Sequence, residues 1–154
     1  MSNIYIHYGS QTGNGESIAS FLKEDIINFH VNGKVFLSTL NNSLDAEYED
    51  VKCIIIICST TGNGEFPENA SRWWRFYKSR LNVKKNFVDK KLVLLGLGDS
   101  NYSHFCKPIQ QIDKRVKELG GKLLMNTCCI DSAIDDEEMT TEWIGKVIST
   151  LQQL

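Results

Sequence analysis

Short apolar runs alternate along the chain with stretches that have helical periodicity. Each run is five or six residues long, and the runs occupy residues 4–8, 35–39, 53–58, 92–97 and 123–128. The run at 53–58 is apolar at every position, which is typical of a strand buried on both faces of a parallel sheet. The pattern therefore predicts five parallel strands.

Four further stretches have the spacing of amphipathic helices, at residues 17–29, 68–81, 105–119 and 138–151. The third is clearest, because its apolar residues recur at intervals of four, three, four and three: Phe105, Ile109, Ile112, Val116 and Leu119. Gly120 and Gly121 then end it. Residues 41–50 are compatible with either a short helix or a loop.

The alternation of strands and helices predicts an α/β fold, doubly wound in three layers. A five-stranded parallel sheet in the order 2-1-3-4-5 would place a ligand crevice between the first and third strands. We find no linker, so we expect one domain over residues 1–154.

The pentapeptide Thr-Gly-Asn-Gly-Glu occurs at residues 12–16 and again at 61–65, each time just after an apolar run. Ligands of open α/β sheets bind outside the carboxyl ends of the strands. Glycine accepts positive φ and lets a ligand approach the backbone N–H groups closely. Both copies therefore mark candidate binding loops.

The first of these loops suits a phosphate group. It offers hydroxyl, amide and backbone donors at the start of a predicted helix, where the helix dipole favours an anion. The first lysine is Lys23, and no arginine precedes it, so the donors are neutral. The nucleotide-hydrolase P-loop and the Gly-x-Gly-x-x-Gly fingerprint are both absent. The alternative is an ordinary glycine-rich turn capped by Ser or Thr.

A third glycine-containing loop, at 97–106, follows the fourth predicted strand. In the expected strand order it lies beside the loop after the third strand, near the crevice. Together the loops suit a flat ring on a phosphate tail, and Tyr102 could stack on that ring. The alternative for Tyr102 and Phe105 is core packing.

Composition narrows the possible partners. The chain has 154 residues, 42% of them hydrophobic, with a net charge of −2 and a pI near 5.9. It has no global attraction for nucleic acid or anionic membranes, and no apolar stretch approaches the roughly 20 residues of a membrane span. The five cysteines show no metal-ligand spacing. We expect reduced thiols and a cytoplasmic monomer.

The three loops together resemble the flavodoxin-like FMN domain. The motifs that carry the resemblance are Gly-Ser-Gln-Thr-Gly-Asn at 9–14, Ser-Thr-Thr-Gly-Asn-Gly-Glu-Phe-Pro-Glu-Asn at 59–69, and Gly-Leu-Gly-Asp-Ser-Asn-Tyr at 96–102 with His-Phe-Cys at 104–106. The versions it resembles are diflavin reductases of the methionine synthase reductase type and single-domain flavodoxins of the MioC type. The resemblance covers nearly the whole chain.

This resemblance implies non-covalent FMN and a set of cofactor-binding residues. The implied phosphate loop consists of Ser10, Gln11, Thr12, Gly13, Asn14 and Gly15. The implied ring-binding residues are Ser59, Thr60, Thr61, Gly62, Asn63, Gly64, Leu97, Gly98, Asp99, Tyr102, His104, Phe105, Cys106 and Asp131. Thr61 departs from the aromatic residue that many family members have there, and threonine supplies no ring to stack on the second face of the flavin.

The implied function is single-electron transfer from a separate NAD(P)H-dependent flavin reductase to an acceptor protein. No catalytic side chain and no metal are expected. The acidic residues Asp135, Asp136, Glu137 and Glu138 are interpreted as a docking patch for a basic partner or as a solvated helix start. An FMN-dependent quinone or nitro reductase is the alternative function. A flavin-free response regulator is excluded, because its aspartate and lysine are missing at the strand ends.

Overall fold

The computed structural model describes residues 3–81, 85–134 and 136–154. Its strands are β1 (Asn3–Gly9), β2 (Val35–Thr39), β3 (Val51–Ser59), β4 (Lys91–Gly98), β5 (Lys122–Leu123) and β6 (Cys128–Asp131). Its helices are α1 (Asn14–Asn28), α2 (Leu40–Ser43), α3 (Glu68–Lys78), α4 (Lys107–Glu118) and α5 (Asp136–Gln152).

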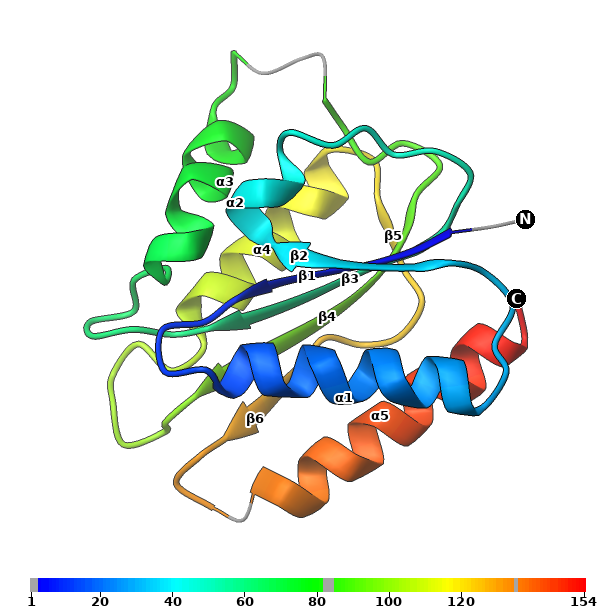
Figure 1. Cartoon of the computed structure of the whole chain (residues 1–154). Helices are drawn as coiled ribbons and strands as arrows, with labels where there is room; N and C mark the ends of the chain where they lie inside the picture. Colours follow the sequence, from blue (N-terminus) through cyan, green and yellow to red (C-terminus); the bar gives the residue numbers. More distant parts are fainter. Residues whose placement is uncertain (1–2, 82–84, 135) are drawn as a thin grey trace.

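All pairings between the described strands are parallel, and the order is β2-β1-β3-β4-β5, with β6 also paired to β4. The predicted α/β fold and strand order are confirmed. The sheet is covered by α1 and α5 on one face and by α2, α3 and α4 on the other (Figure 1). This arrangement brings the loops after β1, β3 and β4 to one edge of the sheet.

The fifth position of the sheet differs from the prediction of one strand at 123–128. Two short strands occupy it, with β5 paired to the start of β4 and β6 to its end. The chain bends at Leu124 and Met125, and both side chains pack on the α1 and α5 side of the sheet. A regular strand points successive residues to opposite faces, so burying both on one face interrupts it.

The core lies in two layers that alternate along β3. Ile55 and Ile57 face the α1 and α5 side, whereas Ile54 and Ile56 face the α3 and α4 side, and all four are fully buried. The continuous apolar run at 53–58 is thus explained by burial on both faces.

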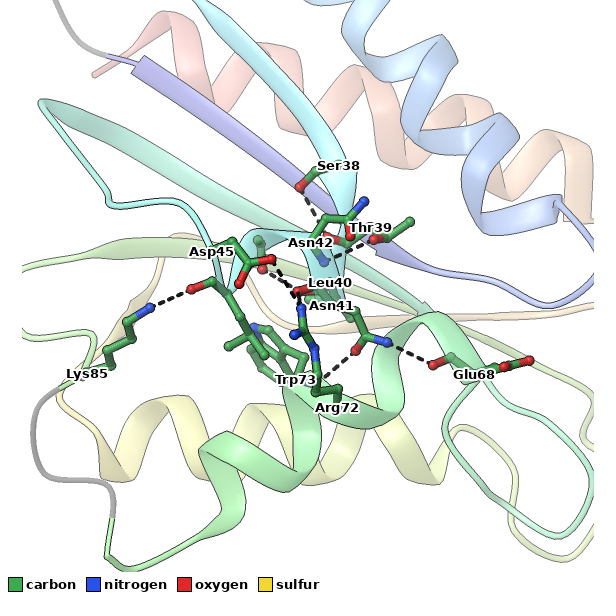
Figure 2. Close-up of polar contacts among 12 residues, drawn as sticks. Ser38, Thr39, Leu40, Asn41, Asn42, Asp45, Glu68, Arg72, Trp73 and Lys85 are labelled. Atoms are coloured by element: carbon green, nitrogen blue, oxygen red, sulfur yellow. Dashed lines mark hydrogen bonds and ion pairs between the residues drawn. The ribbon is translucent and has the colours of Figure 1, made fainter.

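The undecided segment 41–50 begins within a short helix. Helix α2 starts at Leu40, and the Oγ1 atom of Thr39 accepts a hydrogen bond from the N–H of Asn42. Figure 2 shows how α2 is joined to α3. The Asn41 side chain donates to the carbonyl of Glu68 and accepts from the N–H of Trp73. Helix α3 is thereby anchored at its first and second turns, and Trp73 is buried in the core.

Two basic side chains, Arg72 of α3 and Lys85 beyond it, also have partners in or just after α2. Arg72 donates to the carbonyl of Asn41 and forms an ion pair with Asp45, at 2.8 and 3.4 Å (Figure 2). Lys85 donates to the carbonyl of Leu44. No helix within the described ranges combines the length and apolar character needed to cross a membrane.

Candidate cofactor site at the carboxyl edge of the sheet

The first loop (residues 10–15) wraps around one hydroxyl group. The Oγ atom of Ser10 accepts hydrogen bonds from the N–H groups of Gly13 and Gly15, at 3.0 and 3.2 Å. Gly13 has φ 92° and immediately precedes α1, and it has no side chain of its own to cap the helix. The first turn of a helix leaves N–H groups without helical acceptors. Gln11, Thr12 and Asn14 are exposed beside them, so the loop presents neutral donors to an anion.

Asn69 holds this loop from α3. Its Oδ1 atom accepts a hydrogen bond from the N–H of Ser10 at 2.9 Å, across 59 positions of sequence. Next to it, a Cβ atom at Gly9 would lie 2.7 Å from the Cβ of Ala70, so β1 and α3 meet closely here. The sequence prediction did not include Asn69 among the cofactor-binding residues. Its place two residues after Pro67, at a predicted helix start, was the available signal.

The second loop (residues 59–64) closes on itself instead of opening a helix. The N–H of Thr61 donates to the carbonyl of Glu65, and the N–H groups of Gly64 and Glu65 donate to the carbonyl of Thr61. Gly62 and Gly64 have φ 43° and 92°. Glycine at both positions therefore permits a tight turn that keeps Gly62 and Asn63 exposed.

The second loop is fixed to the end of β4 and to the third loop (residues 97–106). Both the N–H and the hydroxyl of Thr60 donate to the carbonyl of Leu97, at 2.9 and 3.0 Å. Gly64 is buried against His104, because a Cβ atom at Gly64 would lie 2.5 Å from the Cβ of His104. The second and third loops are therefore one packed unit.

Asp131 fastens the third loop to β6. Its Oδ1 atom accepts hydrogen bonds from the N–H groups of Ser100 and Ala133, at 3.0 and 2.9 Å. Hydrogen bonds from Ser100 and Ala133 lower the pKa of Asp131. The Ser100 side chain has the largest effect, followed by the N–H groups of Ser100 and Ala133. The carboxylate thus stays ionised while it holds the loop. Tyr102 is 65% exposed at the tip, free to cover a ring.

Cys106 is the last residue of the third loop, directly before α4. It is fully buried and forms the left-handed residue before α4, with φ 56°. This is why α4 starts at Lys107 rather than at Phe105. The side chains of Cys106 and of Cys129 on β6 lie in contact, with Cα atoms 6.5 Å apart, within the range that a disulfide can span. For this pair the expectation of reduced thiols stays a prediction.

A pocket of about 1140 Å³ lies over the three loops and continues between α1 and α5. The predicted site residues that line it are Thr12, Asn14, Ser59, Thr60, Gly62, Leu97, Gly98, Asp99, Tyr102, His104 and Phe105. The other predicted residues do not line the pocket. Asp131 lies on β6, and the rest lie in the same three loops, where Cys106 is buried. Within the described residues no lysine or arginine lines the pocket.

FMN fits this arrangement on structural grounds. A helix start with neutral donors suits its phosphate, and the exposed Tyr102 suits its flat ring. Gly98 lines the pocket and lies close to Cys106. A Cβ atom at Gly98 would lie 3.1 Å from the N and Sγ atoms of Cys106, so the absence of a side chain lets the two residues approach each other.

A sequence profile of the flavodoxin family matches residues 6–143. The chain is a member of the flavodoxin family. Membership of this family confirms the expected FMN cofactor and is consistent with the expected function in electron transfer. The alternative function, a quinone or nitro reductase, is not favoured.

Individual relatives support the same family membership. The chain is 31% identical over 150 residues to NADPH-dependent diflavin oxidoreductase 1 of Candida albicans, covering 96% of this chain and 26% of that protein. It is 31% identical over 150 residues to the sulfite reductase [NADPH] flavoprotein alpha-component of Bacillus subtilis, covering 97% and 24%. The chain thus spans about a quarter of these relatives.

Oxidised flavodoxin 2 from Bacillus cereus superposes with a TM-score of 0.77 at 27% identity, covering 99% of each chain.

Proposed function

We propose that this flavodoxin-family chain carries single electrons from a separate NAD(P)H-dependent flavin reductase to an acceptor protein. The observation that carries the proposal is the pocket over three loops at one sheet edge, with neutral donors at one side and Tyr102 at the other. The names of these relatives include NADPH, which supports an NAD(P)H-linked reductase as the source of the electrons.

In this proposal FMN supplies the redox chemistry when bound. The first-turn N–H groups of α1 and the Thr12 hydroxyl would hold the phosphate. Tyr102 would cover one ring face, and the turn at Gly62 would present backbone groups to the ring edge. Asp99 lines the pocket, and its charge disfavours added negative charge on the cofactor. Among the described residues we assign no side chain the role of catalytic acid, base or nucleophile.

We place partner docking at the start of α5. Glu137 and Glu138 are exposed there, whereas Asp135 lies outside the described residues and the side chain of Asp136 is not described. Carboxylates at a helix N-terminus also favour the helix dipole, so a solvated helix start is the competing explanation. An acidic patch would give fast, salt-sensitive encounter with a basic reductase or acceptor. The proposal includes a cytoplasmic monomer that binds neither nucleic acid nor membrane.

Flavin titration and a two-step electron assay test the function. The purified chain should quench the fluorescence of added FMN and should then be reduced by NADPH only when a flavodoxin reductase is present. The reduced chain should pass electrons to cytochrome c as a test acceptor. A chain that takes up no FMN would refute the proposal. So would rapid NADPH oxidation by the FMN-loaded chain alone, which would indicate an enzyme.

A further inference from the structure

The pocket does not end at the three loops but continues as an apolar groove between α1 and α5. Ile18, Phe21 and Phe29 line it from the α1 side, and Ile144 and Ile148 from α5. Helix α1 has 15 residues, so it is about 22 Å long. Phe29, just past its end, therefore lies a helix length away from the first loop. We call this region the α1/α5 groove.

Two large aromatic side chains in the α1/α5 groove are not covered by the rest of the chain. Phe21 and Phe29 are 59% and 58% exposed. Scattered exposed apolar residues are ordinary, but apolar side chains that share one groove mark an interaction site.

The α5 wall of the groove has no side chain at Gly145. This glycine lies well inside α5, and a Cβ atom built on it meets nothing within 4 Å. Glycine inside a helix is less stable than alanine, and alanine would fit here without any clash. Packing within the chain therefore does not explain the glycine. The bare backbone of Gly145 leaves room at the groove wall for another molecule to approach closely.

The charge of the two helical layers identifies the kind of partner. Helices α1 and α5 contain seven acidic residues and two lysines, whereas α3 and α4 contain three acidic and seven basic residues. Figure 1 shows these pairs on opposite faces of the sheet. Asp25 and Glu137 line the α1/α5 groove, and none of its described lining residues is lysine or arginine.

We propose that the α1/α5 groove binds an amphipathic helix of a partner protein that presents leucine-like side chains beside lysine or arginine. Its apolar residues cover Phe21 and Phe29, its backbone approaches Gly145, and its cations face Asp25 and Glu137. Such an interface lies beside the cofactor loops and is separate from FMN binding itself.

The test uses two fluorescein-labelled 15-residue peptides, one of leucine and lysine and one of leucine and glutamate, with identical helical spacing. The leucine–lysine peptide should bind the FMN-loaded chain in fluorescence anisotropy at least tenfold more tightly than the leucine–glutamate peptide. Its binding should weaken as salt increases. Amide chemical-shift changes in NMR should map to α1 and α5. Equal binding of both peptides, or shifts confined to other elements, would overturn the proposal.

Phe21 and Ile27 provide a matched pair on one helix. They are 59% and 56% exposed, but Ile27 does not line the groove. Phe21→Ser should weaken the leucine–lysine peptide at least tenfold, and Ile27→Ser less than twofold. Gly145→Leu should fill the groove and weaken it similarly while leaving the helix intact, as circular dichroism checks. Equal effects of the two serine variants would contradict the proposal.

Two further readouts separate the alternatives. FMN fluorescence titration of the same samples reports the cofactor site, so loss of FMN binding with retained peptide binding would refute only the proposed electron carrier. Sedimentation velocity tests whether the basic α3 and α4 face of a second copy occupies the groove. A salt-sensitive dimer that Phe21→Ser dissociates would replace the partner helix with a second copy.

Discussion

The two copies of Thr-Gly-Asn-Gly-Glu have the same sequence and different structures. In the first copy, Gly13 precedes α1 and the remaining residues enter the helix, whereas the second copy forms a closed turn from Thr61 to Glu65. The first therefore presents N–H groups at a helix start, and the second presents a turn against the third loop. We infer that these five identical residues form two different parts of the candidate site.

The residues that follow each copy explain the difference. Ser17, Ile18 and Ala19 continue the first copy into a helix, and Ala19 is buried. Phe66 and Pro67 follow the second, and proline disfavours the helical conformation of the residue before it. Helix α3 accordingly begins at Glu68, directly after the proline.

The corresponding glycines Gly15 and Gly64 give the largest expected contrast. Gly64→Ala would combine a φ of 92° with a Cβ 2.5 Å from that of His104. We expect it to lower the free energy of unfolding by about 2–4 kcal/mol, because left-handed strain and overpacking add. Urea denaturation measures this, and FMN affinity should fall with the displaced third loop.

Gly15→Ala is the matched control. Gly15 lies in the first turn of α1, where its nearest contacts would be 3.2 Å and alanine favours the helix. We expect a change below about 1 kcal/mol. Equal destabilisation by the two substitutions would show that the second loop does not depend on its contact with His104.

Asn69→Ala tests whether the first copy depends on α3. It would leave the part-buried N–H of Ser10 without its acceptor, which costs about 1–3 kcal/mol. FMN affinity should fall about tenfold, as fluorescence titration measures. Asn41→Ala is the control, because it removes two hydrogen bonds to α3 without touching the first loop (Figure 2). A similar loss of affinity in both variants would assign the effect to α3 as a whole.

The parts of this fold that the sequence predicts are those encoded by burial or by short motifs. The runs at 53–58 and 92–97 identify strands because β3 and β4 are buried on both faces. Contacts between distant segments leave no such local signal. The division of the fifth strand depends on where Leu124 and Met125 pack, and the hydrogen bond from Ser10 to Asn69 depends on the sheet order.

Gly13→Ala should have a smaller effect on stability than Gly64→Ala. Its φ of 92° lies outside the region that alanine tolerates well, but a Cβ atom there meets nothing within 4 Å. We expect a loss of about 1–2 kcal/mol in the free energy of unfolding from backbone strain alone. Because this residue sets the start of α1, FMN phosphate affinity should also fall. Riboflavin, which lacks the phosphate, should bind the variant and the parent chain equally. A matching loss for riboflavin would place Gly13 at the ring instead.

Gly62→Ala should have the smallest effect on stability and a different effect on the cofactor. Its φ of 43° is near the left-handed conformation that other residues adopt, and a Cβ atom there is also free of contacts. The free energy of unfolding should therefore change by less than about 1 kcal/mol. Gly62 lines the pocket, and we infer that it lies near the ring, so stiffening this exposed turn should move the midpoint potentials of bound FMN. A tenfold change in a one-electron equilibrium corresponds to about 59 mV, which spectroelectrochemistry resolves. A Gly62→Ala chain with shifted FMN affinity and unchanged potentials, matching Gly13→Ala, would show that the two copies do not divide the cofactor between phosphate and ring.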